Sequence, residues 1–212
     1  MPGFVRWFYP TRVWAFSRLK KEIYLTFDDG PNNQITPWVL EELKSAHAKA
    51  TFFCVGDNIR KNPHILKQIL SEGHSIGNHT FNHLKGSRTK TEKYIENVQK
   101  SEEEFKKYCS EKELIDNSFG SKLFRPPYGR ISKKQAGILE KQGYKIVMWD
   151  IISYDYDAGI SGEKCLDNVI SNVKNGSIIV MHDSVKAEKN LRYVLPNLLN
   201  ILTEKGFQFS RM

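Results

Sequence analysis

The sequence predicts an α/β domain built on a parallel sheet, which is either open or closed into a shortened barrel. After Lys21, apolar runs typical of strands alternate with stretches typical of helices roughly six or seven times, without a linker or internal repeat. The 212 residues fall short of the roughly 250 that a full eight-unit barrel needs. Hydrophobic residues at 40% and charged residues at 26% exclude collagen-like, low-complexity and disordered chains.

Each predicted strand is a short apolar run bounded by turn residues or by a polar pair. The first run ends at the turn sequence D-D-G-P, and the second ends at Gly56. Residues 124–128 are also predicted to be extended, because two consecutive prolines are incompatible with a helix interior. In chain order, the other strands cover residues 23–27, 50–55, 75–77, 144–149, 177–181 and 207–209.

The predicted helices carry apolar residues at the spacing of one helix face. Thr36 and Pro37 begin the first helix, since proline suits the first helical position. Gly73 and Gly143 are stop signals for two others. The later helices lie near residues 65–70, 89–109, 132–142, 165–173 and 191–202.

Residue types that carry out chemistry follow the predicted strands. Because the carboxyl ends of parallel strands meet at one face, such folds build their ligand sites there. We therefore expect one site formed by residues at or just beyond strand ends: Asp28, Asp29, His79, His83, Arg125, Asp150, Asp155 and His182.

His79 and His83 are candidate metal ligands, because residues four apart on a helical turn face the same side. Taken alone, this spacing more often marks a surface or capping pair, and Asp28-Asp29 before glycine is ordinary turn chemistry. Together, two imidazoles and one carboxylate make a divalent metal site of the catalytic type. The second aspartate is then free to accept a proton.

Arg125 and His182 each have a structural as well as a functional interpretation. Arg125 could merely cover the barrel end, but a guanidinium also suits the task of keeping two adjacent carboxylates ionised. In isolation, His182 is best interpreted as a core histidine, whereas beside the other residues a catalytic role is favoured.

Five segments of the sequence, taken together, resemble the five motifs of the polysaccharide deacetylases, also called the NodB-homology domain or carbohydrate esterase family 4. The segments are T-F-D-D-G-P at 26–31, His79 with His83, R-P-P-Y-G at 125–129, Asp155-Tyr156, and I-V-M-H-D at 179–183. The resemblance covers nearly everything after the first twenty residues and implies a distorted (β/α)7 barrel. The resemblance thus implies one catalytic domain at 21–212. Residues 1–20 are aromatic and basic, and we expect such a segment to pack its aromatic side chains on the barrel.

The resemblance also implies a role for each matching residue. A divalent metal ion, with zinc favoured over Co²⁺, Ni²⁺, Fe²⁺ or Mn²⁺, would be held by Asp29, His79 and His83. Asp28 would be the general base, kept ionised by Arg125. The backbone N–H of Tyr128 would stabilise the oxyanion, and His182 would be the general acid, oriented by Asp155.

The implied activity is that of a metal-dependent hydrolase, acting on carbon–nitrogen bonds other than peptide bonds, that removes N-acetyl groups from a peptidoglycan- or chitin-like glycan. Alternatives are an O-acetyl-xylan-type esterase, a deacetylase or deformylase of a lipid-linked sugar, and a catalytically silent carbohydrate-binding relative. Tyr128, Tyr156 and Trp149 are candidate substrate contacts, because aromatic faces suit sugar rings, although core packing suits Trp149 equally.

The fourth motif departs from the family pattern, which commonly reads D-x-x-D-W. Here Ile152 replaces the first acid, and Tyr156 replaces the tryptophan. Asp150 either takes over part of the missing role or points elsewhere.

Charge and the amino terminus bear on partners and location. A net charge of +8 favours an anionic glycan over neutral chitin, and the absence of a nucleic-acid-binding motif argues against DNA or RNA. No apolar run reaches the about 7–15 residues of a signal peptide or the about 20 of a membrane span. A cytoplasmic location is the default expectation, with the periplasm or envelope, and membrane contact through residues 1–20, as alternatives.

Cys54, Cys109 and Cys165 are too widely spaced for a zinc–cysteine site.

Overall fold

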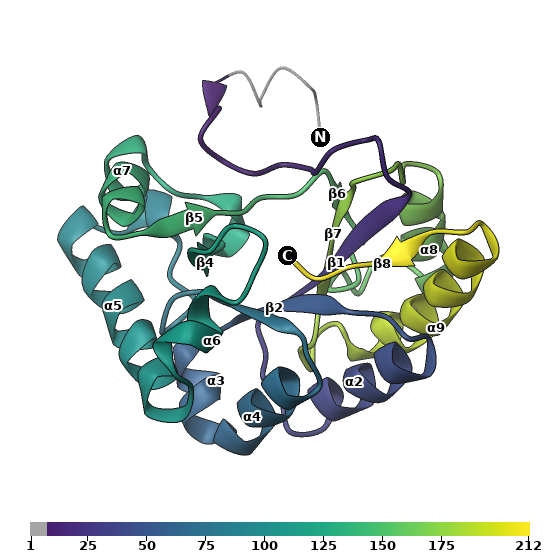
Figure 1. The fold of residues 1–212 in the computed structure, drawn as a ribbon, viewed down its shortest axis with the longest axis horizontal. Coiled ribbons are helices and arrows are strands. Elements are labelled where there is room, and N and C mark those ends of the chain that lie inside the picture. The colour runs from purple at the N-terminus through teal and green to yellow at the C-terminus, as the bar shows by residue number, and fades with distance from the viewer. Residues whose placement is uncertain (1–7) are drawn as a thin grey trace.

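The computed structural model describes residues 8–212 and is organised around a curled, parallel sheet (Figure 1). The strand order is β5-β4-β3-β2-β1-β7-β6, and β8 pairs with the beginning of β1. This arrangement confirms the distorted (β/α)7 barrel. The strands are β1 (Glu22–Asp28), β2 (Ala50–Cys54), β3 (Ser75–Asn78), β4 (Lys122–Phe124), β5 (Tyr144–Ile146), β6 (Ile151–Ile152), β7 (Ile178–His182) and β8 (Gln208–Phe209).

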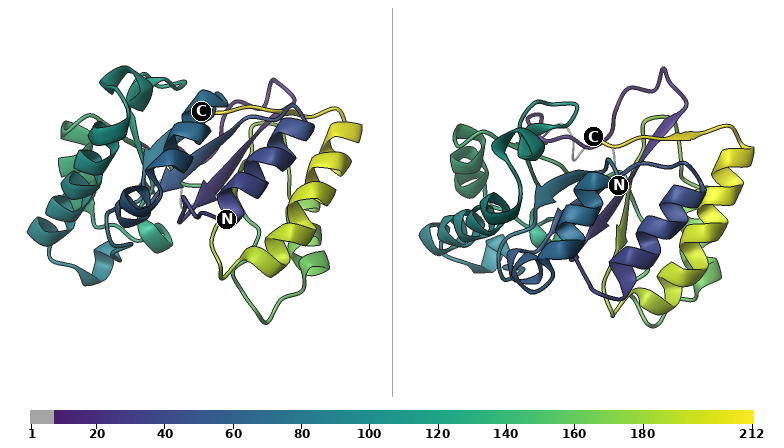
Figure 2. Two further views of the ribbon diagram at one scale, coloured as in Figure 1. Left: turned by 90° about the horizontal axis from the view of Figure 1, so that it is seen from below. Right: turned by 60° about the horizontal axis from the view of Figure 1, so that its bottom comes forward.

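Helices cover the outer face of the curled sheet, as the two turned views also show (Figure 2). Their buried residues recur on one face, as expected from the sequence; in α9 these include Leu191, Val194, Leu195 and Leu198. The helices are α2 (Ile35–Ser45), α3 (Gly56–Lys61), α4 (Pro63–Ser71), α5 (Thr91–Tyr108), α6 (Glu111–Ile115), α7 (Lys133–Lys141), α8 (Gly162–Ile170) and α9 (Glu188–Glu204), with 3-10 turns η1 (Gly86–Arg88) and η2 (Pro127–Gly129). None of the helices among residues 8–212 is long and apolar enough to cross a membrane.

The inside of the curl is filled by its own small apolar cluster. Phe53, Leu123, Val147 and Ile178 point into it from the sheet, and the carboxyl terminus ends at its centre with Met212 buried (Figure 1). The guanidinium of Arg125 lies 4.1 Å above the ring of Phe53. The interior therefore forms an apolar floor beneath the carboxyl ends of the strands.

The amino-terminal segment fills the opening between the two ends of the curled sheet. Val13 pairs in parallel with Val147, just after β5, and Ala15 pairs with Ser177, just before β7. Trp14, between them, is buried in the cluster that contains Ile146 and Tyr94. Within the 1–20 segment, Val13, Trp14 and Ala15 thus contact the barrel, and residues 1–7 lie outside the described residues.

Several element boundaries differ from the sequence predictions. The predicted strand 144–149 ends at Ile146, and Val147 after it forms an isolated bridge with Val13. The predicted extended stretch 124–128 keeps only its first residue in β4 and then forms the turn η2, in which Tyr128 has a φ of 60°. The short helices α3 and α6 were not predicted.

Candidate active site

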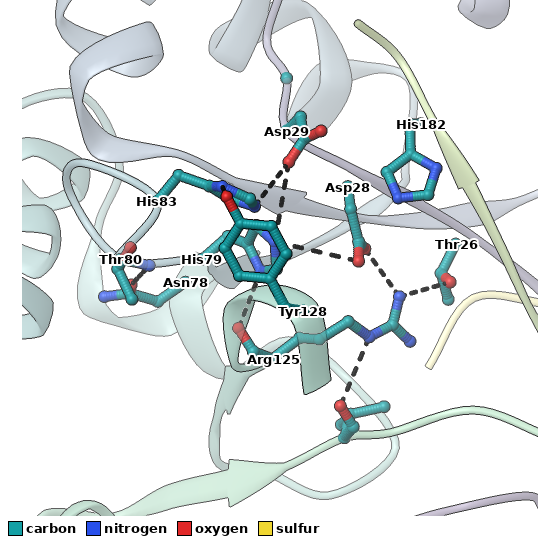
Figure 3. Close-up of polar contacts among 12 residues, drawn as sticks. Thr26, Asp28, Asp29, Asn78, His79, Thr80, His83, Arg125, Tyr128 and His182 are labelled. Atoms are coloured by element: carbon teal, nitrogen blue, oxygen red, sulfur yellow. Dashed lines mark hydrogen bonds and ion pairs between the residues drawn. The ribbon is translucent and has the colours of Figure 1, made fainter. Parts of the chain in front are cut away.

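The site lies where β1, β3, β4 and β7 end, and it brings together residues from across the chain (Figure 3). Asp28 is the last residue of β1, His79 follows β3, Arg125 follows β4, and His182 is the last residue of β7. β1 lies between β2 and β7 at the centre of the sheet, which places Asp28 level with His182. The structure thus places Asp28, His79, Arg125 and His182 at the same edge of the sheet.

Asp29, His79 and His83 form a compact cluster of metal-ligand types. One ligand atom from each residue lies within 4.8 Å of the others. Asp29 Oδ1 is 3.1 Å from His83 Nε2 and 3.7 Å from His79 Nε2. The expectation of a helical turn between the histidines is wrong, because residues 79–83 form a loop with positive φ at Thr80 and His83. The rings nevertheless face the same side, with their centroids 5.1 Å apart.

The other nitrogen of each imidazole is held by a neighbouring group. His79 Nδ1 lies 2.7 Å from the carbonyl oxygen of Arg125, and His83 Nδ1 lies 3.1 Å from the hydroxyl of Tyr128. Because a carbonyl only accepts hydrogen bonds, His79 Nδ1 carries the hydrogen and Nε2 presents its lone pair to the cluster. This is the arrangement that metal-binding histidines adopt. The donor set therefore fits a divalent metal ion.

The charge states of the cluster agree with that fit. Burial lowers the pKa of His79 to about 4, against the opposing effect of Asp28, so the ring is neutral at pH 7. Burial on its own would raise the pKa of Asp29, but the hydrogen bond to His83 and the nearby imidazoles outweigh it and lower that pKa. A neutral imidazole and an ionised carboxylate are the forms that bind metal.

Asp28 is paired with a fully buried arginine. Arg125 Nη1 donates to Asp28 Oδ1 at 2.7 Å and to Thr26 Oγ1 at 2.6 Å, while Nη2 donates to the carbonyl of Met148 at 3.0 Å. Burial lowers the pKa of Arg125 and the charge of Asp28 opposes this effect. The guanidinium is thus fixed beneath the carboxylate and is not a cover at the barrel end.

His182 is paired with Asp155. Its Nδ1 lies 2.8 Å from Asp155 Oδ1, and its backbone N–H donates to Oδ2 at 2.7 Å. Burial disfavours the charged ring, but Asp155, followed by Asp28 and Asp29, outweighs burial and raises the pKa of His182 to about 9. The ring is therefore cationic at neutral pH and can donate a proton.

Three aromatic side chains surround the cluster at different depths. Tyr128 is 60% exposed and lies against His83, and Tyr156 is half-buried with its ring centroid 4.9 Å from that of His182. Trp149 is half-buried directly under Gly129, where an added Cβ would come within 2.7 Å of the indole. Tyr128 and Tyr156 are therefore at the rim, and Trp149 supports the turn that carries Tyr128.

Asp150 does not belong to the site, which corrects its place among the strand-end residues. It precedes β6, and its carboxylate accepts hydrogen bonds from the N–H of Ile178 at 2.7 Å and the hydroxyl of Ser177 at 3.0 Å. It also forms an ion pair with Arg18 at 3.0 Å. Asp150 therefore holds the amino ends of β6 and β7 to the amino-terminal segment. It does not take over the role of the acid that Ile152 replaces, but points away from the site.

Sequence reasoning assigned no role to Asp183, although it directly follows His182. Its carboxyl group is fully buried and accepts hydrogen bonds from the N–H of Gly30 at 2.9 Å and the hydroxyl of Thr36 at 2.5 Å. Burial raises the pKa of Asp183 to about 7. The carboxyl group of Asp183 ties the turn after Asp29 to the start of α2. The one signal in the sequence for this residue is its position directly after His182.

Comparison with known proteins gives consistent matches over most of the chain. The profile of the polysaccharide deacetylase family matches residues 17–147. A peptidoglycan-N-acetylglucosamine deacetylase of Bacillus cereus is 34% identical over 198 residues, covering 93% of this chain and 89% of that relative. A chitooligosaccharide deacetylase of Azorhizobium caulinodans is 32% identical over 197 residues, covering 84% of this chain and 89% of that relative.

A solved structure agrees with the fold throughout. The crystal structure of a peptidoglycan N-acetylglucosamine deacetylase, in complex with a naphthyl N-hydroxybenzamide, matches with a TM-score of 0.87 and 31% identity. The match covers 100% of this chain and 95% of that one. These relatives confirm the predicted enzyme class, a hydrolase of carbon–nitrogen bonds other than peptide bonds. The chain belongs to the polysaccharide deacetylase family, carbohydrate esterase family 4.

Proposed function

We propose that the chain removes the acetyl group from N-acetylglucosamine residues of peptidoglycan, using a divalent metal ion held by Asp29, His79 and His83. The observation that carries this proposal is that the ligand cluster lies beside a buried, charge-paired aspartate. Asp28, which Arg125 holds, has its Oδ2 4.0 Å from His79 Nε2. His182, which pairs with Asp155, lies beyond Asp28 as seen from the cluster (Figure 3).

The ligand set supports zinc first among the divalent metals. Two imidazole nitrogens and one carboxylate oxygen are ligands that zinc favours at sites which keep a position for water or substrate. When bound, such an ion would act as a Lewis acid: it polarises a carbonyl and lowers the pKa of bound water to near neutral pH. Co²⁺, Ni²⁺, Fe²⁺ and Mn²⁺ accept the same donors with different affinities.

Asp28 is proposed as the general base. Its Oδ1 accepts the hydrogen bond from Arg125, so Oδ2 is the oxygen that faces the ligand cluster. Arg125 offsets the cost of burying this carboxylate, and Oδ2 is proposed to take a proton from the attacking water. If Asp28 and Asp29 were only turn residues, the buried ion pair between Asp28 and Arg125 would have no explanation.

His182 is proposed as the general acid. The attack places negative charge on the acetyl oxygen, and the backbone N–H of Tyr128 is the proposed donor to it. Collapse then expels an amine, which is a poor leaving group unless it is protonated. Asp155 keeps His182 cationic and holds Nδ1, so Nε2 remains to deliver the proton.

The substrate assignment is supported by the relatives and by the rim of the site. Tyr128 and Tyr156 offer aromatic faces at the rim, and lysine side chains lie over both rings, Lys85 over Tyr128 and Lys186 over Tyr156. A basic rim and a net charge of +8 favour a glycan that carries carboxylates. A peptidoglycan substrate favours the envelope over the cytoplasm as the working location.

The test combines metal analysis with acetate release. The purified chain should hold about one divalent ion, chelation should abolish acetate release, and Asp28→Asn should abolish it while keeping the ion. Asn197→Ala, an exposed change on α9, serves as the control and should keep full activity. A fully active Asp28→Asn would exclude Asp28 as the base, and faster turnover of neutral chitooligosaccharides than of peptidoglycan fragments would overturn the substrate assignment.

A further inference from the structure

The loop between His79 and His83 is held in an unusual backbone conformation. Thr80 has a φ of 65° and His83 a φ of 55°, both in the left-handed region. A β-branched residue such as threonine is rarely found there, and such strain persists only where the surroundings enforce it. The spacing of the two histidines therefore depends on groups that hold this loop from outside.

Two of these groups come from the elements next to the loop. Asn78, at the end of β3, accepts a hydrogen bond from the N–H of Thr80 at 2.8 Å. The N–H groups of Gly56 and Asp57, at the start of α3, donate to the carbonyls of Thr80 at 3.0 Å and Phe81 at 3.1 Å. These contacts fix the first half of the loop. None of them involves the N–H groups of Phe81 and Asn82, which bond to a residue outside these elements.

That partner is Asn97, on α5. Its Oδ1 accepts both remaining hydrogen bonds, from the N–H of Phe81 at 2.9 Å and from the N–H of Asn82 at 3.0 Å. Its Nδ2 donates to the side chain of Asn82 at 3.0 Å. One oxygen atom thus holds two consecutive peptide groups that lead directly into His83.

We propose that Asn97 is a positioning residue for the metal site, because its side-chain oxygen sets the place of His83 relative to His79. The inference rests on the proposed metal site. Without that oxygen the Phe81–Asn82 backbone can rotate, and His83 Nε2 leaves its position 3.1 Å from Asp29 Oδ1 for part of the time. Outer groups that orient metal ligands are typically worth 10–100-fold in metal affinity.

Asn97 allows a cleaner test than Asn78. Asn78 is buried and also bonds Val98 and Tyr144, so replacing it would disturb the core. Asn97 is half-buried, and alanine in its place suits a helix. Aspartate keeps an acceptor oxygen, replaces the donor to Asn82 by a second oxygen and adds a negative charge. Asn97→Asp is therefore the variant that keeps the two acceptor bonds that Asn97→Ala removes.

The experiment measures Zn²⁺ dissociation constants by chelator competition and the visible absorption spectrum of the Co²⁺-loaded chain. Asn97→Ala should weaken Zn²⁺ binding by about 10–100-fold and alter the Co²⁺ spectrum. Asn97→Asp and the control Asn197→Ala should stay within about threefold of the unmodified chain in the same assay. Unfolding of each chain in EDTA separates a loss of metal affinity from a loss of fold.

Each result decides a different claim. Unchanged Zn²⁺ affinity in Asn97→Ala would overturn the inference, and so would equal weakening in Asn97→Asp, which keeps both acceptor bonds. Absence of Zn²⁺ binding in the unmodified chain would instead overturn the metal site on which the inference rests.

Discussion

At the scale of single residues, Arg125 shows how this fold tolerates a buried charge. The side chain is fully buried, yet its donors face Asp28, Thr26 and the carbonyl of Met148. Burying an ion pair is costly, and the cost becomes much larger when one partner is removed. The pair is therefore a sensitive point for stability as well as for the proposed chemistry.

Replacing Arg125 with methionine should leave Asp28 buried without its cation. We expect Arg125→Met to lower the free energy of unfolding by about 3–5 kcal/mol, measured by urea denaturation at pH 7 in EDTA. The double variant Arg125→Met/Asp28→Asn removes the unpaired charge and should recover part of the loss. A cost below about 1 kcal/mol in the single variant would contradict this account of the pair.

The raised pKa of His182 makes a prediction about pH. His182 stays protonated until the pH approaches about 9, so the proposed acid is lost only as the pH rises through that value. Asp155→Asn removes the strongest of the interactions that raise the pKa of His182, and burial, then opposed only by Asp28 and Asp29, lowers that pKa. The alkaline limb of the kcat profile should therefore move to lower pH than in the unmodified chain.

The His182–Asp155 pair should also contribute to the free energy of unfolding. Because the folded pKa of His182 is above the unfolded value, the pair stabilises the fold fully below pH 6.5 and loses this effect as the pH rises through about 9. The difference in unfolding free energy between the unmodified chain and Asp155→Asn should shrink between pH 6 and pH 10. A difference independent of pH would show that Asp155 acts only through packing.

Most site residues in the five motifs could be predicted from the sequence, although the structural role of Asp183 within the last motif was missed. Asp28, Asp29, His79 and His83 follow strands whose apolar runs are plain in the sequence. Asn97 lies in a helix face that looks solvated, and its partners are backbone groups that carry no sequence signal. Asp150 was misplaced because the predicted strand before it extended past Ile146.

At the scale of elements, the close approach of α3, the histidine loop and α5 depends on Gly56. A Cβ at this position would lie 2.8 Å from the ring of Phe81, 2.8 Å from the hydroxyl of Ser101 and 2.9 Å from its Cα. Glycine lets the start of α3 reach the loop carbonyls. Sequence patterns predicted α5 well, whereas the short helices α3 and α6 have too few residues for a periodic signal.

Gly56→Ala should separate these elements. We expect a loss of about 1–3 kcal/mol in unfolding free energy from overpacking, measured by thermal or urea denaturation. Gly137→Ala, in α7, is the matched control, since a Cβ there has no atom within 4 Å. Gly137→Ala should raise the free energy of unfolding by about 0.5–1 kcal/mol, because alanine is more favourable than glycine inside a helix. An unchanged Gly56→Ala would show that α3 can shift without cost.

At the scale of the whole molecule, the barrel wall is completed by a segment that is not a regular strand. Trp14 is buried at the opening between β5 and β7, whereas nearby Phe8 is 68% exposed. The fold class was predictable because it rests on alternating patterns along the chain. The closing role of this segment was not, because its isolated bridges to Val147 and Ser177 leave no periodicity in the sequence.

Trp14→Ala should open that part of the wall. We expect it to lower the free energy of unfolding by about 3–5 kcal/mol, the usual cost of removing a large buried aromatic side chain. Phe8→Ala should change it by less than about 0.5 kcal/mol. Both are measured by urea denaturation, and a small effect of Trp14→Ala would mean that the segment only rests on the barrel.

The amino-terminal bridges also order the events of folding. Val13 leaves the ribosome well before Val147 and Ser177 are synthesised. Contacts so distant in sequence form late, because the intervening loop must close first. Until then Trp14 is exposed apolar surface on a nascent chain, the kind of segment that chaperones protect. The segment around Trp14, although synthesised before the strands that it bridges, is thus expected to be among the last parts of the barrel wall to take its place.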